Sequence, residues 1–236
     1  MPTGTPTPPN TLYYGDNLKV LREHIDDASV DLVYLDPPFN SNADYNVLFA
    51  EKDGTAAPAQ IKAFGDTWTW DLKAAQEYAE LLNVAHLSES HQRTAATLRG
   101  LQQVLGGSDM LAYLSMMALR LLELRRVMKE TASIYLHCDP TASHYLKVVM
   151  DAVFGPQQFR SEIVWKRTSA HGNASANYAA VHDLILCYSK SETRTWNRVY
   201  QPYDEDYVRE HFVHKDPDGR VFRRADLRNP GYRPNL

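Results

Sequence analysis

Four consecutive residues, Asp36, Pro37, Pro38 and Phe39, combine groups that can hold an amino group on a flat ring. They follow an apolar run at 30–35 that has the length and composition of a buried strand. The two prolines have no N–H to donate and restrict the chain direction, so the Asp36 carboxylate and nearby carbonyls form a cluster of acceptors. Phe39 adds an apolar face on which an aromatic ring can stack. The tetrad therefore predicts a pocket for an exocyclic amine on a planar base.

The tetrad and its neighbours resemble a known enzyme family. "DPPF" is similar to the Asp/Asn/Ser-Pro-Pro-Tyr/Phe/Trp motif of S-adenosylmethionine-dependent DNA methyltransferases that modify amino nitrogens. Further segments resemble the beta-class enzymes, which include modification subunits of restriction systems: "YYGDNLKVL", "FNSNADYNVLF", "SIYLHCDPTASHYLKVVMDAVFG", "FRSEIVWKRT" and "HDLILCYSKS". The resemblance covers nearly the whole chain from Thr11 onward.

The resemblance implies a site-specific enzyme that moves a methyl group from S-adenosylmethionine to N6 of an adenine flipped out of double-stranded DNA. Asp36 and the Pro37 carbonyl would accept the hydrogens of the amine, and Phe39 would stack on the base. An Asp at the first motif position resembles the adenine enzymes, whereas cytosine-N4 enzymes more often carry Ser. A cytosine-N4 methyltransferase and a DNA-binding module without catalysis remain as alternatives. A protein-glutamine methyltransferase fits less well, because those enzymes typically begin the motif with Asn.

The resemblance also implies contacts for the cofactor and the base. Asp16 is placed like the family acid that contacts the adenine of the cofactor, and Asn17 and Asp36 complete the predicted cofactor-binding set. Tyr45 and Asn46 are predicted to shape the base pocket.

Three charged residues at predicted strand ends have two interpretations each. Lys166 and Arg167 are candidates for contact with DNA phosphates, with a solvated surface as the alternative. Asp139 either lines the same crevice or caps the helix that Pro140 begins, and the cap is favoured.

The elements that must position these residues form an α/β pattern. Apolar runs predict strands at 11–15, 30–35, 132–139, 159–167 and 182–190, with helices after Asn17, near Met110 and after Pro140. Asn17 is the expected cap of the first helix. In the long helix near Met110 the methionines are expected to pack in the core, and Arg120 is expected to lie off the apolar stripe. Strands ending at Asp16, Asp36 and Asp139 would bring three carboxylates to one crevice of a parallel sheet.

The fold class is therefore α/β, an incomplete Rossmann-like methyltransferase sheet, mostly parallel with a closing antiparallel hairpin. We predict a disordered leader at 1–10, part of the catalytic core at 11–190 and the start of a target-recognition region at 191–236. The family's glycine-rich "FxGxG" cofactor loop is absent from the sequence, and with it the first two strands of the family sheet. We therefore expect an N-terminal fragment that is marginally stable and inactive alone and binds S-adenosylmethionine poorly, with unpaired sheet edges.

Charge and composition add further expectations. The net charge is −4, but from Lys166 onward 12 Lys and Arg outnumber 9 Asp and Glu. The C-terminal part is thus basic, which suits double-stranded DNA as a partner, besides a restriction subunit and a second copy as further candidates. Cys138 and Cys187 are expected to be small buried thiols. His211 and His214 have no further Cys or His ligand near them, so no metal site is expected. The start lacks the features of a signal peptide, which favours a cytoplasmic protein without a membrane segment.

Overall fold

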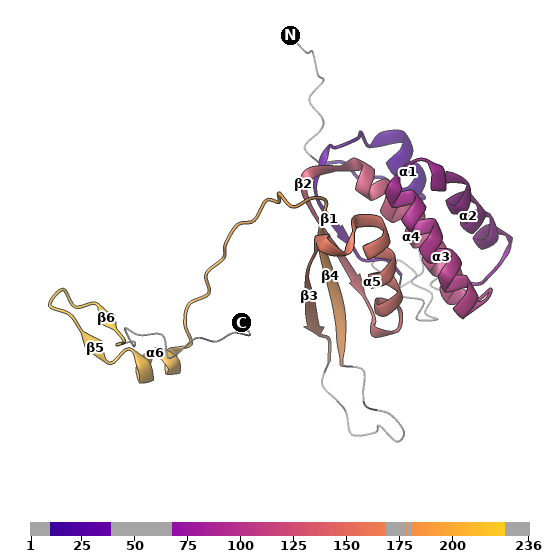
Figure 1. Ribbon diagram of the computed structural model, residues 1–236. Helices are drawn as coiled ribbons and strands as arrows, with labels where there is room; N and C mark the ends of the chain where they lie inside the picture. Colours follow the sequence, from indigo (N-terminus) through magenta and orange to yellow (C-terminus); the bar gives the residue numbers. More distant parts are fainter. Residues whose placement is uncertain (1–9, 39–67, 169–177, 179–180, 225–236) are drawn as a thin grey trace, which may run out of the picture. The chain divides into compact units, whose positions relative to one another are not determined.

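The computed structural model describes residues 10–38, 68–168, 178 and 181–224 (Figure 1). The chain divides into two compact units, Met1–Thr195 and Trp196–Leu236. The first contains a four-stranded sheet and five α-helices among its described residues. The second contains the short helix α6 (Glu205–His211) and a hairpin of β5 (His214–Lys215) and β6 (Val221–Phe222). No described helix is long and apolar enough to cross a membrane.

The sheet of the first unit has the strand order β1-β2-β4-β3. Its strands are β1 (Val30–Leu35), β2 (Met128–Cys138), β3 (Phe159–Lys166) and β4 (His182–Ser189). β1 pairs with β2 in parallel, while β4 pairs antiparallel with both β2 and β3. The predicted closing hairpin is confirmed, and because β4 inserts between β2 and β3, the sheet is mixed. Three strands share one direction, but only one of the three described pairs is parallel, so the sheet is mixed where a mostly parallel one was predicted.

The predicted strand at 11–15 is wrong. Residues 10–14 have no regular structure, and Leu12 is 96% exposed. A strand is stable only when a neighbour accepts its hydrogen bonds, and no described strand lies beside this segment. Gly15, with φ +141°, turns the chain into α1 (Asn17–His24).

The cap of α1 also differs from the prediction. Asp16, not Asn17, is the N-cap, because its Oδ1 accepts a hydrogen bond from the Leu18 backbone N–H at 2.9 Å. Asn17 is the first helical residue. Asp and Asn cap helices equally well, so residue type alone could not distinguish two adjacent candidates.

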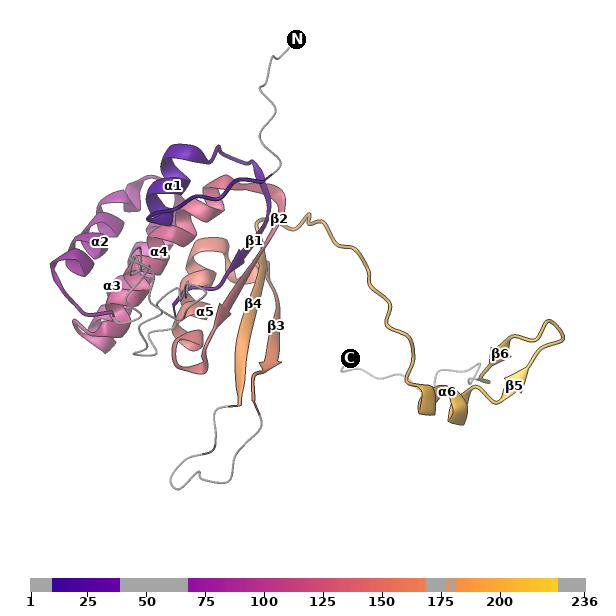
Figure 2. The same cartoon turned by 180° about the vertical axis from the view of Figure 1, so that it is seen from behind.

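The helices pack as a layer to one side of the sheet, seen from both directions in Figures 1 and 2. The other helices are α2 (Leu72–Asn83), α3 (Glu89–Leu105), α4 (Asp109–Val127) and α5 (Pro140–Phe154), with single 3₁₀ turns at Val84–His86 and Pro156–Gln158. Helix α4 lies at the centre of the helical layer, since it packs against α1, α2, α3 and α5. Its predicted stripe of Leu111, Leu114, Ala118 and Leu121 is fully buried.

Two expectations about α4 have different outcomes. Met116 and Met117 are buried in the core, which confirms a packing role. Arg120 was expected away from the core, and this is wrong, because only 9% of it is exposed. A helix surrounded by four others is buried nearly all round, so a position outside the main apolar stripe is enclosed as well.

The two cysteines are buried free thiols, as expected. Cys138 is the last residue of β2, and burial, reinforced by the nearby carboxylates of Asp139, Glu162 and Asp183, raises the pKa of its thiol to about 12. Such a thiol stays protonated near neutral pH and behaves as a small apolar side chain.

One face of the sheet packs on the helices and the opposite face does not. Along β2, Ala132, Ile134, Leu136 and Cys138 are buried, while the residues between them are partly exposed. We call the second face the open face. The strand registers place these apolar residues on it: Leu32, Tyr34, Tyr135, Ile163, Trp165 and Ile185. Leu32, Tyr34 and Trp165 are each about 60% exposed. Tyr135 and Ile185, on the two central strands, are partly buried.

We expect the isolated chain 1–236 to be marginally stable because of the open face and because β1 has a neighbour on only one side among the described strands. It should bind the dye ANS in buffer and unfold in urea with a free energy below about 5 kcal/mol, the lower limit for ordinary domains. Fluorescence titration and urea denaturation followed by circular dichroism measure the two quantities. A sharp transition with a larger free energy and no dye binding would contradict this expectation.

Candidate active site

Asp36 lies immediately after β1, at the carboxyl end of the strand. Its side chain is 64% exposed, so the carboxylate faces outward, while Pro37 and Pro38 behind it are half-buried. The carboxylate Oδ1 lies 3.1 Å from Nδ1 of His137. Phe39, Tyr45 and Asn46 lie outside the described residues, so their roles stay predictions.

The other two acids of the predicted crevice serve helix caps. Asp139 caps α5, because its Oδ1 accepts a hydrogen bond from the Ala142 N–H at 3.0 Å, which confirms the favoured interpretation. Asp16 caps α1 as described above. Asp36 and Asp139 therefore follow strands, as predicted, whereas Asp16 follows a segment without regular structure.

Arg120 holds both predicted cofactor contacts of α1. Its Nη2 donates to Asp16 Oδ1 at 2.8 Å and its Nε donates to Asn17 Oδ1 at 2.7 Å. Its Nη1 donates to the Met116 carbonyl at 3.0 Å and lies 3.9 Å from Glu77 Oε1. The hydrogen bonds that Asp16 accepts from the Leu18 N–H and from Arg120 both end on Oδ1. Asp16 Oδ2 accepts no hydrogen bond from the described residues, and this half-exposed carboxylate keeps an acceptor for a ligand.

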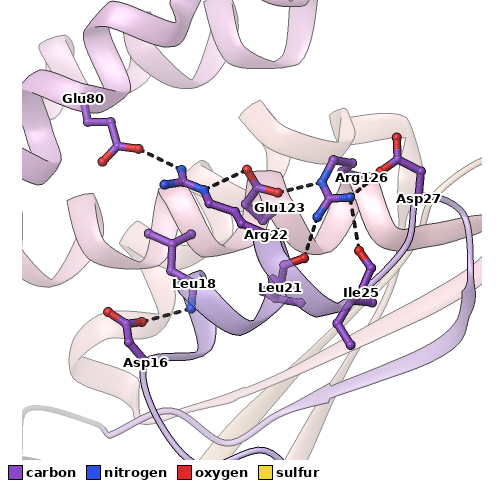
Figure 3. A network of polar contacts seen from close by, with 9 residues as sticks. All are labelled: Asp16, Leu18, Leu21, Arg22, Ile25, Asp27, Glu80, Glu123 and Arg126. Carbon is purple, nitrogen blue, oxygen red and sulfur yellow. Dashed lines mark hydrogen bonds and ion pairs between the residues drawn. The ribbon is translucent and has the colours of Figure 1, made fainter.

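A second ionic network fixes the other end of α1 (Figure 3). Arg126 of α4 donates to the carbonyls of Leu21 and Ile25 at 2.7 and 3.3 Å, which satisfies acceptors at the C-terminus of α1, and it also pairs with Asp27. Glu123 accepts from Arg126 at 2.7 Å.

Arg22 extends this network from α1 to α2. It donates to Glu123 at 3.2 Å and to Glu80 at 2.8 Å, as Figure 3 shows. Helix α1 is thus held on α4 at its start by Arg120 and at its end by Arg126. The consequence is a fixed position for Asp16 and Asn17.

Glu77 of α2 is a mostly buried acid that lies near Arg120. Burial raises the pKa of its carboxyl, and the cations Arg120 and Lys73 only partly offset that rise. A carboxyl whose folded pKa exceeds its unfolded value contributes stability below the unfolded pKa, and this contribution is lost as the pH rises through the folded pKa.

We therefore expect the unfolding free energy of the Glu77→Gln variant to rise relative to that of the wild type as the pH increases from about 4.5 to 7.5. Urea denaturation of both proteins at the two pH values measures the difference in unfolding free energy. A difference that stays constant, or that favours the wild type more at the higher pH, would contradict the raised pKa.

His137 connects Asp36 to a buried acid. His137 Nε2 lies 3.4 Å from Asp183 Oδ2, and Asp183 Oδ1 lies 3.2 Å from Arg167 Nη1. The Asp183 side chain is only 4% exposed. Sequence reasoning missed both His137 and Asp183. The available signal was their position, since each is polar and lies within two residues of the end of an apolar strand.

Lys166 and Arg167, the predicted phosphate contacts, lie at the end of β3. Lys166 is exposed, and its backbone pairs with His182 of β4. Arg167 is half-exposed and forms the ion pair with Asp183. Neither position tests contact with DNA.

The second unit is organised around aromatic rings. Tyr207 stacks on His211, with ring centroids 4.3 Å apart, and its hydroxyl accepts a hydrogen bond from Arg223 at 2.6 Å. Tyr203 and Phe212 pack against each other in the same cluster. In the described parts of the chain no group of three or more His, Cys, Asp or Glu side chains could hold a metal ion.

Comparison with known proteins identifies relatives of this chain. The sequence matches the N6/N4 DNA methylase family over residues 30–229. The StyLTI Mod subunit, a type III restriction-modification enzyme of Salmonella typhimurium, is 28% identical over 211 residues, covering 88% of this chain and 27% of the relative. The type II methyltransferase M.EcaI of Enterobacter cloacae is 30% identical over 122 residues, covering 52% of this chain and 27% of the relative. The type III EcoP15I Mod subunit of Escherichia coli is 28% identical over 183 residues, covering 77% and 24%.

The chain thus spans about a quarter of the length of these relatives. Among solved structures, a Thermus thermophilus protein described as a DNA modification methylase aligns over 84% of this chain and 58% of its own, at 14% identity and a TM-score of 0.36. That score is too low to support an inference. The match to the family, by contrast, extends over most of the sequence and includes Asp36 and both strands of the closing hairpin. This chain therefore belongs to the N6/N4 DNA methylase family, and it is similar to methyltransferases of type II and type III restriction-modification systems.

Proposed function

We propose that the protein containing this chain transfers a methyl group from S-adenosylmethionine to N6 of an adenine that is flipped out of double-stranded DNA. The main support is the exposed Asp36 carboxylate at the carboxyl end of β1, followed by two prolines that contribute no donor. Adenine is preferred over cytosine because the motif begins with Asp. Similarity to type III Mod subunits makes a restriction subunit the proposed protein partner, and a second copy of the chain is a further candidate.

The acceptor groups of the chain fit the cofactor. When bound, S-adenosylmethionine supplies an activated methyl group on a positively charged sulfur. Asp16, whose Oδ2 accepts no bond from the described residues, would hold an amino group of the cofactor, and Asn17 lies next to it under the same arginine. Asp36 offers a second carboxylate, which suits a cation. The glycine-rich loop of the family is absent from this sequence, so we place tight binding in the complete protein.

Asp36 would position the amino group of the nucleobase, and the reaction would not require a strong proton acceptor. Its carboxylate and the Pro37 carbonyl would accept the two hydrogens of the amino group and hold the nitrogen lone pair toward the methyl donor. The same acceptors would stabilise the positive charge that develops on the nitrogen, which then releases its surplus proton to water. A base within a duplex cannot reach these groups, so it must leave the stack first. Phe39 is proposed as the surface on which it rests.

The test is methyl transfer by the full-length protein with labelled S-adenosylmethionine and duplex DNA. We expect label on the DNA, and loss of labelling when every adenine of the target is doubly methylated at N6. Loss of labelling only when cytosine N4 is blocked would assign the cytosine reaction. Binding of the duplex in a gel-shift assay without any transfer of label would identify a non-catalytic DNA-binding protein.

A further inference from the structure

The sheet register brings three polar side chains from three strands to one corner of the open face. β1 and β2 run in parallel with Leu35 opposite Leu136, so the residues that follow, Asp36 and His137, are neighbours. On β4, Asp183 lies two residues from Ile185, the partner of His137, and therefore on the same face. The three residues are separated by 101 and 46 positions in the sequence.

The three side chains follow one another from the surface into the interior of the protein. The exposed fraction is 64% for Asp36, 18% for His137 and 4% for Asp183. Each nitrogen of the His137 ring faces one carboxylate, at 3.1 Å and 3.4 Å. A buried carboxylate is costly unless a cation compensates its charge, and Arg167 provides one at 3.2 Å from Asp183. The ring is therefore held from its buried side.

We propose that His137, held by Asp183, is a positioning residue that orients the Asp36 carboxylate for the amino group of the base. This inference rests on the proposed methyl transfer. An exposed aspartate rotates among several side-chain conformers, and a partner on Oδ1 selects one of them. With Oδ1 bound to His137, Oδ2 is presented to the substrate. Orientation of this kind affects the rate of the chemical step more than the affinity for the substrate.

The bonding pattern also determines which substitution can replace the ring. Ionised carboxylates only accept hydrogen bonds, so the contact with Asp36 requires an N–H on Nδ1 of His137. The side-chain N–H₂ of Asn lies about as far from the backbone as Nδ1 of His. His137→Asn therefore keeps a donor for Asp36 and loses the one for Asp183, whereas His137→Ala loses both.

The experiment compares these two variants in the full-length protein, with kcat and the KM values for S-adenosylmethionine and DNA measured separately. His137→Ala should lower kcat by about 10- to 100-fold, an effect of the size seen when residues that orient metal ligands are removed, and leave both KM values unchanged. His137→Asn should recover a large part of that loss. His144→Ala, an exposed histidine on α5, is the matched control and should behave like the wild type.

Each other result overturns the proposal. A normal kcat for His137→Ala would show that His137 does not orient Asp36, and a change confined to KM would assign His137 to substrate binding. Equal loss in both variants shows that the N–H toward Asp36 is not what matters. Thermal unfolding of each variant separates these effects from loss of the fold, and His137→Asn provides the folded protein if His137→Ala does not fold. Failure of the proposed function is distinct, because then the wild type transfers no methyl group or Asp36→Ala remains fully active.

Discussion

Replacing Asp36 by alanine is expected to lower the rate of methyl transfer by about 10²- to 10³-fold, the loss typical when one preorganised polar group at a reacting centre is removed. The carboxylate is exposed at the end of β1, and among the described residues its removal breaks one side-chain hydrogen bond, to His137. The folded state should therefore be retained. A single-turnover assay with labelled cofactor and excess full-length enzyme measures the rate, and circular dichroism checks the fold.

The control for this variant is Asp31→Ala. Asp31 is also an exposed acid of β1, 72% exposed and paired with Lys129 at 2.7 Å, but it lies near the opposite end of the strand. Its removal should leave the transfer rate unchanged. Methyl transfer by Asp36→Ala at the wild-type rate would refute the role given to the tetrad at 36–39.

The second large effect is expected at Arg120. Arg120→Met keeps the apolar stem and removes the guanidinium, which leaves the enclosed carboxylate of Glu77 with Lys73 as its remaining nearby cation and removes the support of Asp16. The side chains of Arg120 and Glu77 are only 11% and 13% exposed, and breaking a buried ion pair by removing one partner typically costs about 3–5 kcal/mol. Because Asp16 is half-exposed and loses less, we expect a decrease at the lower end of this range, about 3 kcal/mol, in the unfolding free energy measured with urea.

Two further variants test the cause of that loss. Arg22→Ala also removes an arginine that pairs with two glutamates, but Arg22 is 40% exposed, and the cost should stay below about 1 kcal/mol. Glu77→Gln in the Arg120→Met background should recover part of the stability, because it removes the charge that lost its partner. Strict additivity of the two substitutions would show that the cost arises elsewhere, for example at the hydrogen bond to the Met116 carbonyl.

Local pattern was sufficient for most of the scaffold. The apolar run at 30–35 is β1, and the runs at 159–167 and 182–190 are β3 and β4 to within one residue. The stripe of α4, the cap at Asp139 and the buried thiols also agree with expectation. Such features depend on the alternation of apolar residues and on bonds between near neighbours, and both are written within a short stretch of sequence. The exposed position of Asp36 follows from the same rule, since it directly follows a strand.

The contacts that define the site were decided by tertiary structure. The segment at 11–15 has the composition of a strand, but a strand also requires a partner, and none is described beside it. Arg120 is buried because α1 and α2 pack on α4, which its own helix does not predict. His137 meets Asp36 and Asp183 only through the registers of β1, β2 and β4. The sequence by itself determined that Asp36 and Asp139 follow strands, and only the packing of distant segments decided which side chains meet, because such contacts depend on strand order and register.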